Sequence, residues 1–306
     1  MPNHLVSSIK NKDKIALSKA ITLIENRLPN YESVLSDSFL YRNTVQKIGI
    51  TGPPGAGKST ITNQLCKDFL AENKTIAVIC VDPSSPFNGG AILGDRIRMK
   101  DINMSDDVFI RSIASRGNSG GLADCIADID ILLETFGFDL IIYETVGVGQ
   151  IELDVINYCD TVVLAITPES GDDIQMMKAG LIECANIIAI NKSDRPGASK
   201  LNTLLNQYLD IGDRKQRPSV LNLIAIKNEG VDLLRNKIIE HFSFLIDKKI
   251  KKKKDDEKYK SIIYSIAQKK LLDSFLTEKR LNLIAEEILK SPSSRISPYK
   301  FFDKIK

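Results

Sequence analysis

The residues best suited to chemistry stand between a short β-branched run and a helical stretch. Val45, Ile48 and Ile50 form the run, and the pattern G-x-x-x-x-G-K-[ST] follows it at once. Glycines allow backbone N–H groups to converge on phosphate oxygens, and the helix that follows directs the positive end of its dipole at the same place. We expect the whole stretch to bind a nucleoside phosphate: Gly52, Pro53, Pro54, Gly55, Ala56, Gly57, Lys58, Ser59 and Thr60.

Two side chains of this loop have separate expected roles. Lys58 is expected to reach the β- and γ-phosphates, and the Ser59 hydroxyl is expected to ligate Mg²⁺. The alternative is a chance match on an ordinary Gly-Pro-Gly turn. The strand before the loop and the helix after it favour the phosphate loop.

A carboxylate closes a second apolar run, residues 139–144. Glu144 ends this run and leads into the glycine-bearing segment 145–150. A carboxylate placed there beside a phosphate loop normally holds Mg²⁺, directly or through water. The alternative is a strand end that faces solvent. Gly147 suits a backbone that approaches the γ-phosphate and moves when it leaves.

The base is predicted from the pattern N-K-x-D at residues 191–194, which follows an apolar run. The Asp194 carboxylate can accept hydrogen bonds from N1–H and the exocyclic amine of guanine, and adenine offers no such donor pair. Asn191 is expected to brace the loop, and the stem of Lys192 can lie over the base plane. The sequence therefore predicts GTP and GDP as ligands, with Mg²⁺.

Strand and helix signals alternate along most of the chain. Strands are predicted at 45–51, 76–82, 108–113, 139–144, 161–167, 187–191 and 220–226, and helices at 58–72, 121–136, 172–185, 197–209 and 230–246. This alternation predicts an α/β fold, a P-loop NTPase with a mainly parallel sheet and helices on both faces. Ligands of such sheets bind beyond the carboxyl ends of the strands.

Segments outside this alternating region are predicted to be helical. Residues 14–28 have helical apolar spacing and Pro29 closes them, with a further short helix before Tyr41. Residues 258–290 are predicted to form one long helix with an apolar face, which covers either its own domain or a second subunit. The expected division is an N-terminal helical segment, 1–44, a GTPase domain, 45–247, and a C-terminal helical extension, 248–306.

Composition excludes several classes of protein. The 306 residues carry a net charge of only +3, and the lysine-rich run after residue 247 is interpreted as a solvated helix face or linker, not a nucleic-acid site. No apolar run approaches the roughly 20 residues that a membrane span needs, and the N-terminus lacks a secretion signal, so the cytoplasm is expected. Five scattered cysteines and two histidines predict free thiols and no transition-metal site.

Five motifs, in order, closely resemble those of the MeaB/ArgK family: GPPGAGKST, DPSSPFNGGAILGDRIRM, RSIASRGNSGG, ETVGVGQIE and NKSD. The opening stretch IALSKAITLIENRLP is also similar, so the resemblance covers roughly residues 14–245. It implies a P-loop GTPase that acts as a chaperone of the adenosylcobalamin-dependent enzyme methylmalonyl-CoA mutase or a related acyl-CoA mutase. It also implies a homodimer formed through the C-terminal helix.

The resemblance also implies roles for individual residues. Mg²⁺ would be held, directly or through water, by Ser59, Asp82, Asp95 and Glu144, and the catalytic set would be Lys58, Asp82 and Glu144. Asp82 would also orient the attacking water. Residues 82–99 would move with the nucleotide state, as would 171–180 with its charged contact Lys178.

The chain departs from the family pattern at the guanine-backing loop. The family usually has Ser-Ala there, and this chain has Ile224, Ala225 and Ile226, so the serine is absent. The Ala225 amide can still face the guanine carbonyl. Ile151, which follows Gln150, also replaces a small polar residue that the family usually has there.

Two questions stay open at the level of sequence. Candidate stabilisers of the transition-state charge, among which the sequence does not choose, are Arg96, Arg98, Arg111 and Arg116. The leading function is a GTP-hydrolysing chaperone that gates adenosylcobalamin loading or protection of a mutase. Alternatives are a kinase of a transport protein, a metal-delivery GTPase without its Cys/His motif, and a nucleotide-gated scaffold with negligible turnover.

Overall fold

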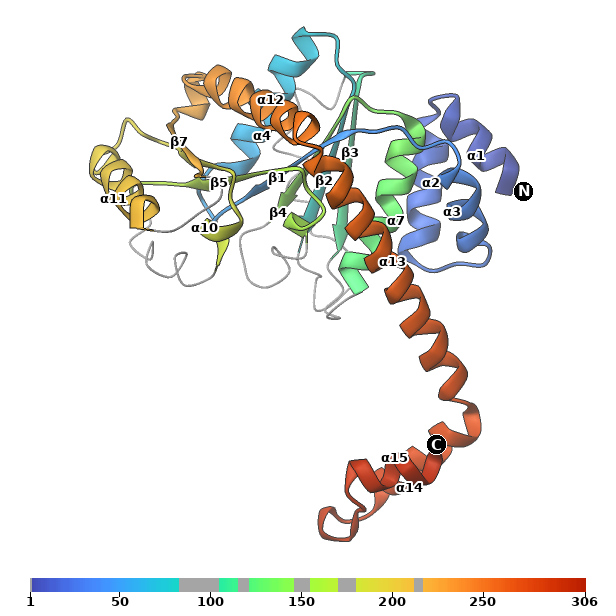
Figure 1. Cartoon of the computed structure of the whole chain (residues 1–306). Helices are drawn as coiled ribbons and strands as arrows, with labels where there is room; N and C mark the ends of the chain where they lie inside the picture. The colour runs from blue at the N-terminus through green and yellow to red at the C-terminus, as the bar shows by residue number, and fades with distance from the viewer. Residues whose placement is uncertain (1, 83–104, 115–120, 146–154, 170–179, 212–216) are drawn as a thin grey trace. The chain divides into compact units, whose positions relative to one another are not determined.

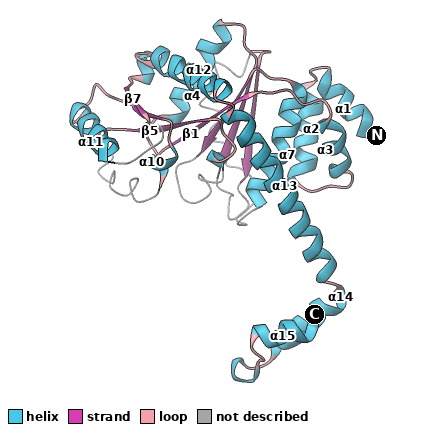
Figure 2. Ribbon diagram, viewed as in Figure 1, coloured by secondary structure: helices cyan, strands magenta, loops and turns pink. Residues whose placement is uncertain are grey.

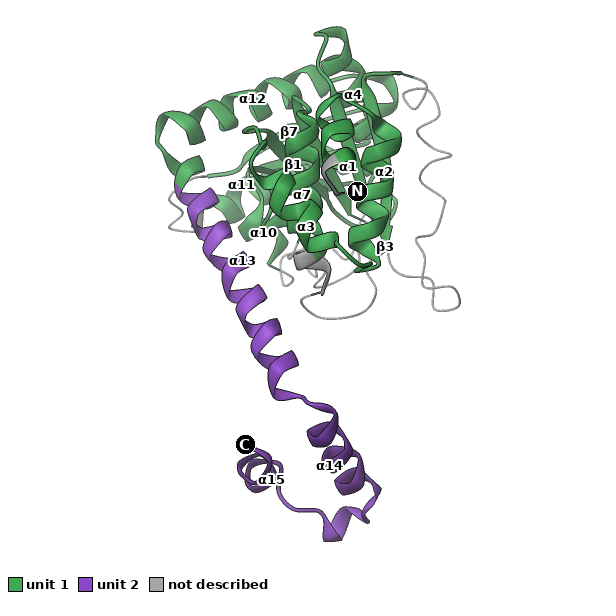
Figure 3. Cartoon of the chain, turned by 90° about the vertical axis from the view of Figure 1, so that its right-hand side faces the viewer, with its two compact units in different colours: residues 1–252 green, residues 253–306 purple. Residues whose placement is uncertain are grey.

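A computed structural model of the chain describes residues 2–82, 105–114, 121–145, 155–169, 180–211 and 217–306. The chain divides into two compact units, residues 1–252 and residues 253–306 (Figure 3). Among the helices in the described ranges, none combines the length and the apolar character needed to cross a lipid bilayer.

The first unit is built on a seven-stranded sheet (Figures 1 and 2). Every neighbouring pair of strands is parallel, in the order β3-β2-β4-β1-β5-β6-β7. The strands are β1 (Gln46–Thr51), β2 (Ile76–Asp82), β3 (Val108–Ala114), β4 (Leu140–Thr145), β5 (Thr161–Ile166), β6 (Ile187–Ile190) and β7 (Ser219–Asn222). β1 and its neighbours β4 and β5 are almost wholly buried, as continuous apolar runs predict for a parallel sheet. The predicted fold class is confirmed.

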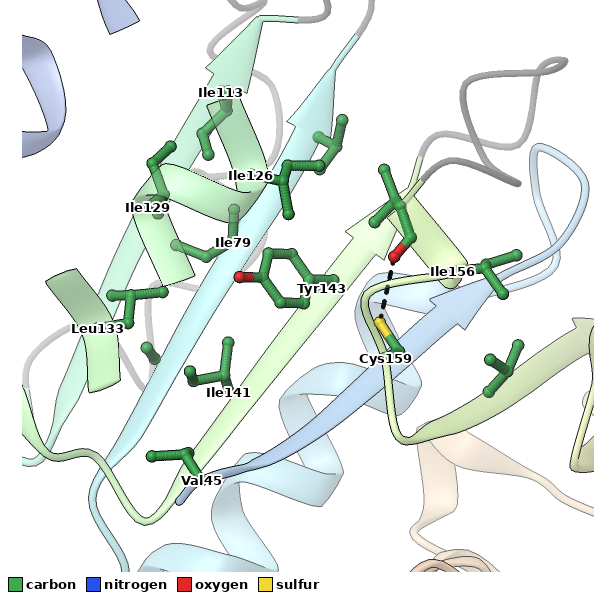
Figure 4. Packing of buried hydrophobic residues seen from close by; sticks show 14 of the residues in the cluster. Val45, Ile79, Ile113, Ile126, Ile129, Leu133, Ile141, Tyr143, Ile156 and Cys159 are labelled. Carbon is green, nitrogen blue, oxygen red and sulfur yellow. Dashed lines mark hydrogen bonds between the residues drawn. The ribbon is translucent and has the colours of Figure 1, made fainter. Parts of the chain in front are cut away.

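Helices cover both faces of the sheet. On one face, α4 (Lys58–Ala71) and α12 (Val231–Asp247) share a core with Ile48 and Ile142. On the other face lie α7 (Gly121–Phe136), α10 (Leu181–Cys184) and α11 (Ala198–Ile211). Figure 4 shows Ile129 and Leu133 of α7 over the strands near Tyr143.

Three N-terminal helices extend the α7 side of the core: α1 (Pro2–Lys10), α2 (Lys14–Glu25) and α3 (Tyr31–Phe39). The Asp13 carboxylate caps α2 by accepting hydrogen bonds from two amides of its first turn. The helices 14–28 and before Tyr41 were predicted, whereas α1 was not. Its described contacts with the core come from the buried Val6 and Ile9 and the partly buried Leu5, a set of apolar residues too short for periodicity to detect.

The second unit corrects the prediction of one helix over 258–290. The structure has α13 (Ile250–Phe275) and α14 (Glu278–Leu289), followed by the 3₁₀ turn η2 (Pro292–Ser294) and α15 (Pro298–Ile305). Thr277 is extended and its side chain accepts a hydrogen bond from the Arg280 amide, so it begins a new helix. The Arg280 side chain donates to the Ile305 carbonyl at 2.6 Å and closes the unit on itself.

One predicted strand of the first unit is shorter in the structure, and one predicted helix is described only in part. The strand predicted at 220–226 ends at Asn222, and the 3₁₀ turn η1 (Ala225–Lys227) follows it. The Lys227 N–H donates to the Ile224 carbonyl at 2.9 Å, so the backbone has already left the strand conformation in the last residues of the predicted strand. Of the helix predicted at 172–185, Leu181–Cys184 is observed, and residues 170–179 lie outside the described residues.

Candidate nucleotide site

The phosphate loop joins the end of β1 to the start of α4, as its pattern predicts. Two of its glycines are required by close contacts. Gly52 has a φ of 139°, and a Cβ there would lie 1.9 Å from the Ala165 carbonyl oxygen of β5. Gly57 has a φ of 85°, and a Cβ there would lie 2.3 Å from Asn191 Nδ2. Any larger residue would push the loop off the sheet edge.

Lys58, the first residue of α4, folds back over this loop. Its side chain is only 8% exposed, and Nζ donates to the carbonyl oxygens of Gly52 at 2.7 Å and Pro53 at 3.0 Å. The ammonium group therefore lies over the backbone that was predicted to hold phosphates. Its charge adds to that of the α4 dipole, whose N-terminus points to the same place.

Glu144 lies at the carboxyl end of β4 and is only 4% exposed. Its two carboxylate oxygens accept from different hydroxyls of α4: Oε1 from Ser59 Oγ at 2.5 Å, and Oε2 from Thr62 Oγ1 at 2.7 Å. The predicted alternative of a solvent-facing strand end therefore does not hold. A buried carboxylate beside a serine hydroxyl is a set of hard oxygen donors, which suits Mg²⁺.

Thr62 has no place in the phosphate-loop pattern, and the sequence did not single it out. The signal that could have found it is its position three residues after Ser59, because residues three apart lie on the same face of a helix. The charge of Glu144 also affects Cys66 on α4. Burial raises the pKa of the Cys66 thiol, and the nearby Glu144 charge raises it further, so this thiol stays protonated.

The other two predicted metal ligands are only partly placed. Asp82 ends β2, and its neighbour Val81 is paired with Thr145, so its backbone lies at the same sheet edge as Glu144. Asp95 lies outside the described residues, with the rest of the segment 83–99. Among the described residues there is no cluster of three or more His, Cys, Asp or Glu that could hold a metal ion.

Asn191, immediately after β6, joins the phosphate loop to the predicted guanine site. Its Nδ2 donates to the Ala56 carbonyl at 2.8 Å, and its Oδ1 accepts from the Ala225 N–H at 3.1 Å. The Ala225 amide, which was expected to face the guanine carbonyl, thus donates to a side chain of its own protein. The next residue, Ile226, is 81% exposed at the same turn. Ile224, which the resemblance places where the family usually has serine, immediately precedes the turn.

Lys192 and Asp194 occupy a tight turn beside this pair. Lys192 has a φ of 55°, and the next amide, Ser193 N–H, donates to the Leu223 carbonyl at 3.0 Å. Asp194 is exposed at the surface of the turn. The turn thus lies beside Ala225 and Ile226, so the two segments predicted to contact the base are neighbours.

Arg111 is placed away from the phosphates by its contacts. Its guanidinium donates to Glu25 at 2.5 Å and to Thr22 Oγ1 at 3.0 Å, and both partners belong to α2. It therefore joins β3 to the N-terminal helices. The other three candidate arginines, together with Gly147, Ile151, Lys178 and the segment 171–179, lie outside the described residues.

The comparisons with known proteins agree with this geometry. A family model described as "Methylmalonyl Co-A mutase-associated GTPase MeaB" matches residues 17–280. A putative GTPase of Pyrococcus abyssi is 41% identical over 315 residues, which is 100% of this chain and 96% of the relative. GTPase ArgK of Escherichia coli is 36% identical, covering 77% of this chain and 74% of the relative.

A solved structure also shares the fold. The crystal structure of a protein titled "LAO/AO transport system kinase" superposes with a TM-score of 0.73 over 99% of this chain and 96% of that chain, at 24% identity. At this identity the likeness concerns the fold. The phosphate loop, the Ser59–Glu144 pair and the family match over 17–280 lead to one conclusion: this chain belongs to the MeaB family of P-loop GTPases.

Proposed function

We propose that this GTPase acts as a chaperone of an adenosylcobalamin-dependent acyl-CoA mutase, methylmalonyl-CoA mutase or a relative, and gates the loading or protection of its cofactor. The observation that carries the proposal is the family match over residues 17–280, whose description names a methylmalonyl-CoA mutase-associated GTPase. Its GTP and GDP states would present different surfaces to the mutase through residues 82–99 and 144–154.

The reaction is attack of water on the γ-phosphate of GTP, with GDP as the leaving group. Lys58 and the loop amides of residues 52–60 would neutralise the charge on the β- and γ-phosphates. Ser59 and Glu144 would hold Mg²⁺, with Asp82 and Asp95 completing its shell, and the bound ion would supply further neutralisation of the phosphate oxygens. Asp82 would also orient the attacking water.

Guanine would be selected by the turn after β6. The Asp194 carboxylate would accept both hydrogen bonds from the guanine edge, and the Lys192 stem would lie over the base. Asn191 would hold the turn in register with the phosphate loop, as its contacts with Ala56 and Ala225 support. Because the Ala225 amide already has a partner, the amide of Ile226, a residue that is 81% exposed, is the better candidate donor to the guanine carbonyl.

We divide the chain into an N-terminal segment, 1–44, a GTPase domain, 45–247, and a C-terminal extension, 248–306. The C-terminal extension would join two copies of the chain as a homodimer. Support comes from apolar side chains that the second unit exposes, among them Ile263, Ile266, Leu271, Leu272, Leu281 and Leu289. The proposed setting is the cytoplasm, and neither nucleic acid nor a membrane is a proposed partner.

The experiment that tests the function is GTP hydrolysis by the purified chain with Mg²⁺, alone and with an adenosylcobalamin-dependent mutase of the same organism. ATP and the Lys58→Met variant are the controls. We expect consumption of GTP but not ATP, a many-fold stimulation by the mutase, and none in the variant. An unchanged rate and no complex would leave the GTPase without this client. Transfer of the γ-phosphate to protein would favour the kinase.

A further inference from the structure

A buried hydroxyl beside Glu144 is left without a role by the phosphate-loop pattern. Thr62 lies on α4, three residues beyond Ser59, and is completely buried. Its Oγ1 lies 2.7 Å from Glu144 Oε2, while Ser59 Oγ lies 2.5 Å from Oε1. One face of α4 therefore presents two hydroxyls to one carboxylate, with a separate oxygen for each.

The Thr62 hydroxyl has two possible acceptors for its single proton. The Lys58 carbonyl, one turn earlier in α4, lies 3.0 Å away, and Glu144 Oε2 lies 2.7 Å away. A hydrogen bond to an ionised carboxylate is shorter and stronger than one to a neutral carbonyl, so the proton is directed to Glu144. The hydroxyl thus holds Oε2 and leaves Oε1 directed at Ser59.

The surroundings of Glu144 make this contact important. In the sheet register, Glu144 lies between Ile50 of β1 and Cys80 of β2, and the adjoining core on this face includes Ile61 and Ile142. A carboxylate at the edge of an apolar core depends on nearby donors to keep one orientation. Thr62 provides such a donor from the helix that begins at the phosphate loop.

We propose that Thr62 is a positioning residue for Mg²⁺-dependent nucleotide binding. It acts through Glu144, which it orients towards Ser59, and it does not touch the nucleotide. The inference rests on the proposed function, in which Ser59 and Glu144 hold Mg²⁺. Replacing the Thr62 hydroxyl by a methyl group would leave Oε2 without this donor and release the carboxylate from its fixed orientation.

The test compares Thr62→Val, which keeps the shape and loses the hydroxyl, with Thr62→Ser, which keeps the hydroxyl. Thr135→Val is the matched control, because the buried Thr135 hydroxyl donates to carbonyls of Ser38 and Ile131, away from the site. The measurement is the dissociation constant of a fluorescent, non-hydrolysable GTP analogue, with saturating Mg²⁺ and with EDTA. The full chain is used, and thermal unfolding is recorded for each variant.

For Thr62→Val we expect the Mg²⁺-dependent gain in affinity to fall about tenfold, as for the loss of a hydrogen bond to a charged group. Affinity in EDTA should stay within about twofold of the wild type, and Thr62→Ser and Thr135→Val should keep the full gain. If Mg²⁺ raises the nucleotide affinity of Thr62→Val as much as that of the wild type, this inference is wrong while the proposed function stands. The same holds if the variant loses affinity equally with Mg²⁺ and with EDTA. If wild-type affinity ignores Mg²⁺, the proposed metal ligands fail, and this inference fails with them.

Discussion

The two ends of the same central strands hold their charged side chains in different ways. Near the start of β1, Lys47 is 3% exposed and its ammonium lies 2.6 Å from Asp130 and 2.7 Å from Glu134, both on α7. At the carboxyl ends, the described partners of Lys58 are carbonyl oxygens, and those of Glu144 are hydroxyls. The contacts near the start of β1 pair opposite charges, whereas the contacts described at the carboxyl ends include hydrogen bonds from or to neutral groups.

The cluster near the start of β1, called the lower cluster, consists of Lys47, Asp130, Glu134 and Tyr143, and Glu134 also pairs with Arg42 at 3.5 Å. Tyr143 OH donates to Asp130, and its side chain lies beneath α7 (Figure 4). Burial raises the pKa of this phenol, and the Asp130 charge raises it further. Burial lowers the pKa of Lys47, but the two carboxylates more than offset this effect and leave the pKa raised. The cluster is therefore a fixed structural link between α7 and the sheet.

The site at the carboxyl ends of the strands, formed by Lys58 and Glu144 and called the upper site, has contacts of a different kind. A carbonyl or hydroxyl can hold a charged side chain in place without cancelling its charge. A charge placed in this way keeps its field for phosphate oxygens or a cation. The comparison therefore predicts that the lower cluster contributes chiefly to stability, and that the upper site contributes chiefly to binding and turnover.

The largest expected effect is the loss of stability in Lys47→Met. Asp130 would be left buried without this cation, and the half-buried Glu134 would keep the more distant Arg42 at 3.5 Å, so the free energy of unfolding should fall by about 3–5 kcal/mol. The raised folded pKa of Lys47 means that this contribution is complete below the unfolded value of about 10.4 and is lost only as pH rises through the folded value. Denaturant unfolding should therefore show a similar loss at neutral and mildly alkaline pH.

A triple variant sharpens this prediction. Lys47→Met combined with Asp130→Leu and Glu134→Leu replaces the charges together, and most of the lost stability should return, since no buried charge is left unpaired and Arg42, which loses Glu134, is one-third exposed. A fall of less than about 1 kcal/mol in the single variant would mean that Lys47 is not the centre of a buried ion network. Hydrolysis per folded molecule should stay close to that of the wild type.

Lys58→Met is the opposite case. Its removal takes a positive charge from the phosphate loop, so kcat/KM for GTP should fall by about 10²–10³-fold, as for other preorganised electrostatic groups. The free energy of unfolding should change by less than about 1 kcal/mol, because the hydrogen bonds to the Gly52 and Pro53 carbonyls contribute little net stability. Steady-state kinetics and denaturant unfolding on the same preparation check both parts. A large loss of stability would erase the contrast with Lys47.

The smallest effect is expected from Asp139→Asn, just before β4. Burial alone raises the pKa of Asp139, but hydrogen bonds from the Thr75 amide and hydroxyl outweigh burial and lower it. A carboxylate whose pKa is lowered in the folded state stabilises the fold at pH values above its unfolded pKa. This stabilisation is lost as the pH falls through the folded pKa. By denaturant unfolding, the variant should lose less than about 1 kcal/mol at pH 7, and the loss should shrink as pH falls below the unfolded value of about 3.9. A loss that stays constant as pH falls would contradict the electrostatic origin.

The alternation of apolar runs and helical stretches was enough to predict the sheet, because strand and helix periods are local properties of the chain. The phosphate loop was also recognisable, since its function depends on residue types at fixed short spacings, and the guanine-binding role of the turn at 191–194 stays a prediction on the same basis. Local spacing likewise predicted that Glu144 ends a strand. Local spacing failed at the C-terminal helix. One helix was predicted across the break at Thr277, because the apolar periodicity continues through it.

Tertiary structure alone decided which distant residues meet. The contacts of Glu144 with Thr62, of Asn191 with Ala225, and of Arg111 with Glu25 join segments that lie 82, 34 and 86 positions apart. No local period encodes such pairings, because they depend on strand order and on the faces that α2 and α4 turn towards the sheet. The sequence thus determined the elements and the kind of ligand. Packing determined which charge is neutralised as structure and which is held ready at the nucleotide site.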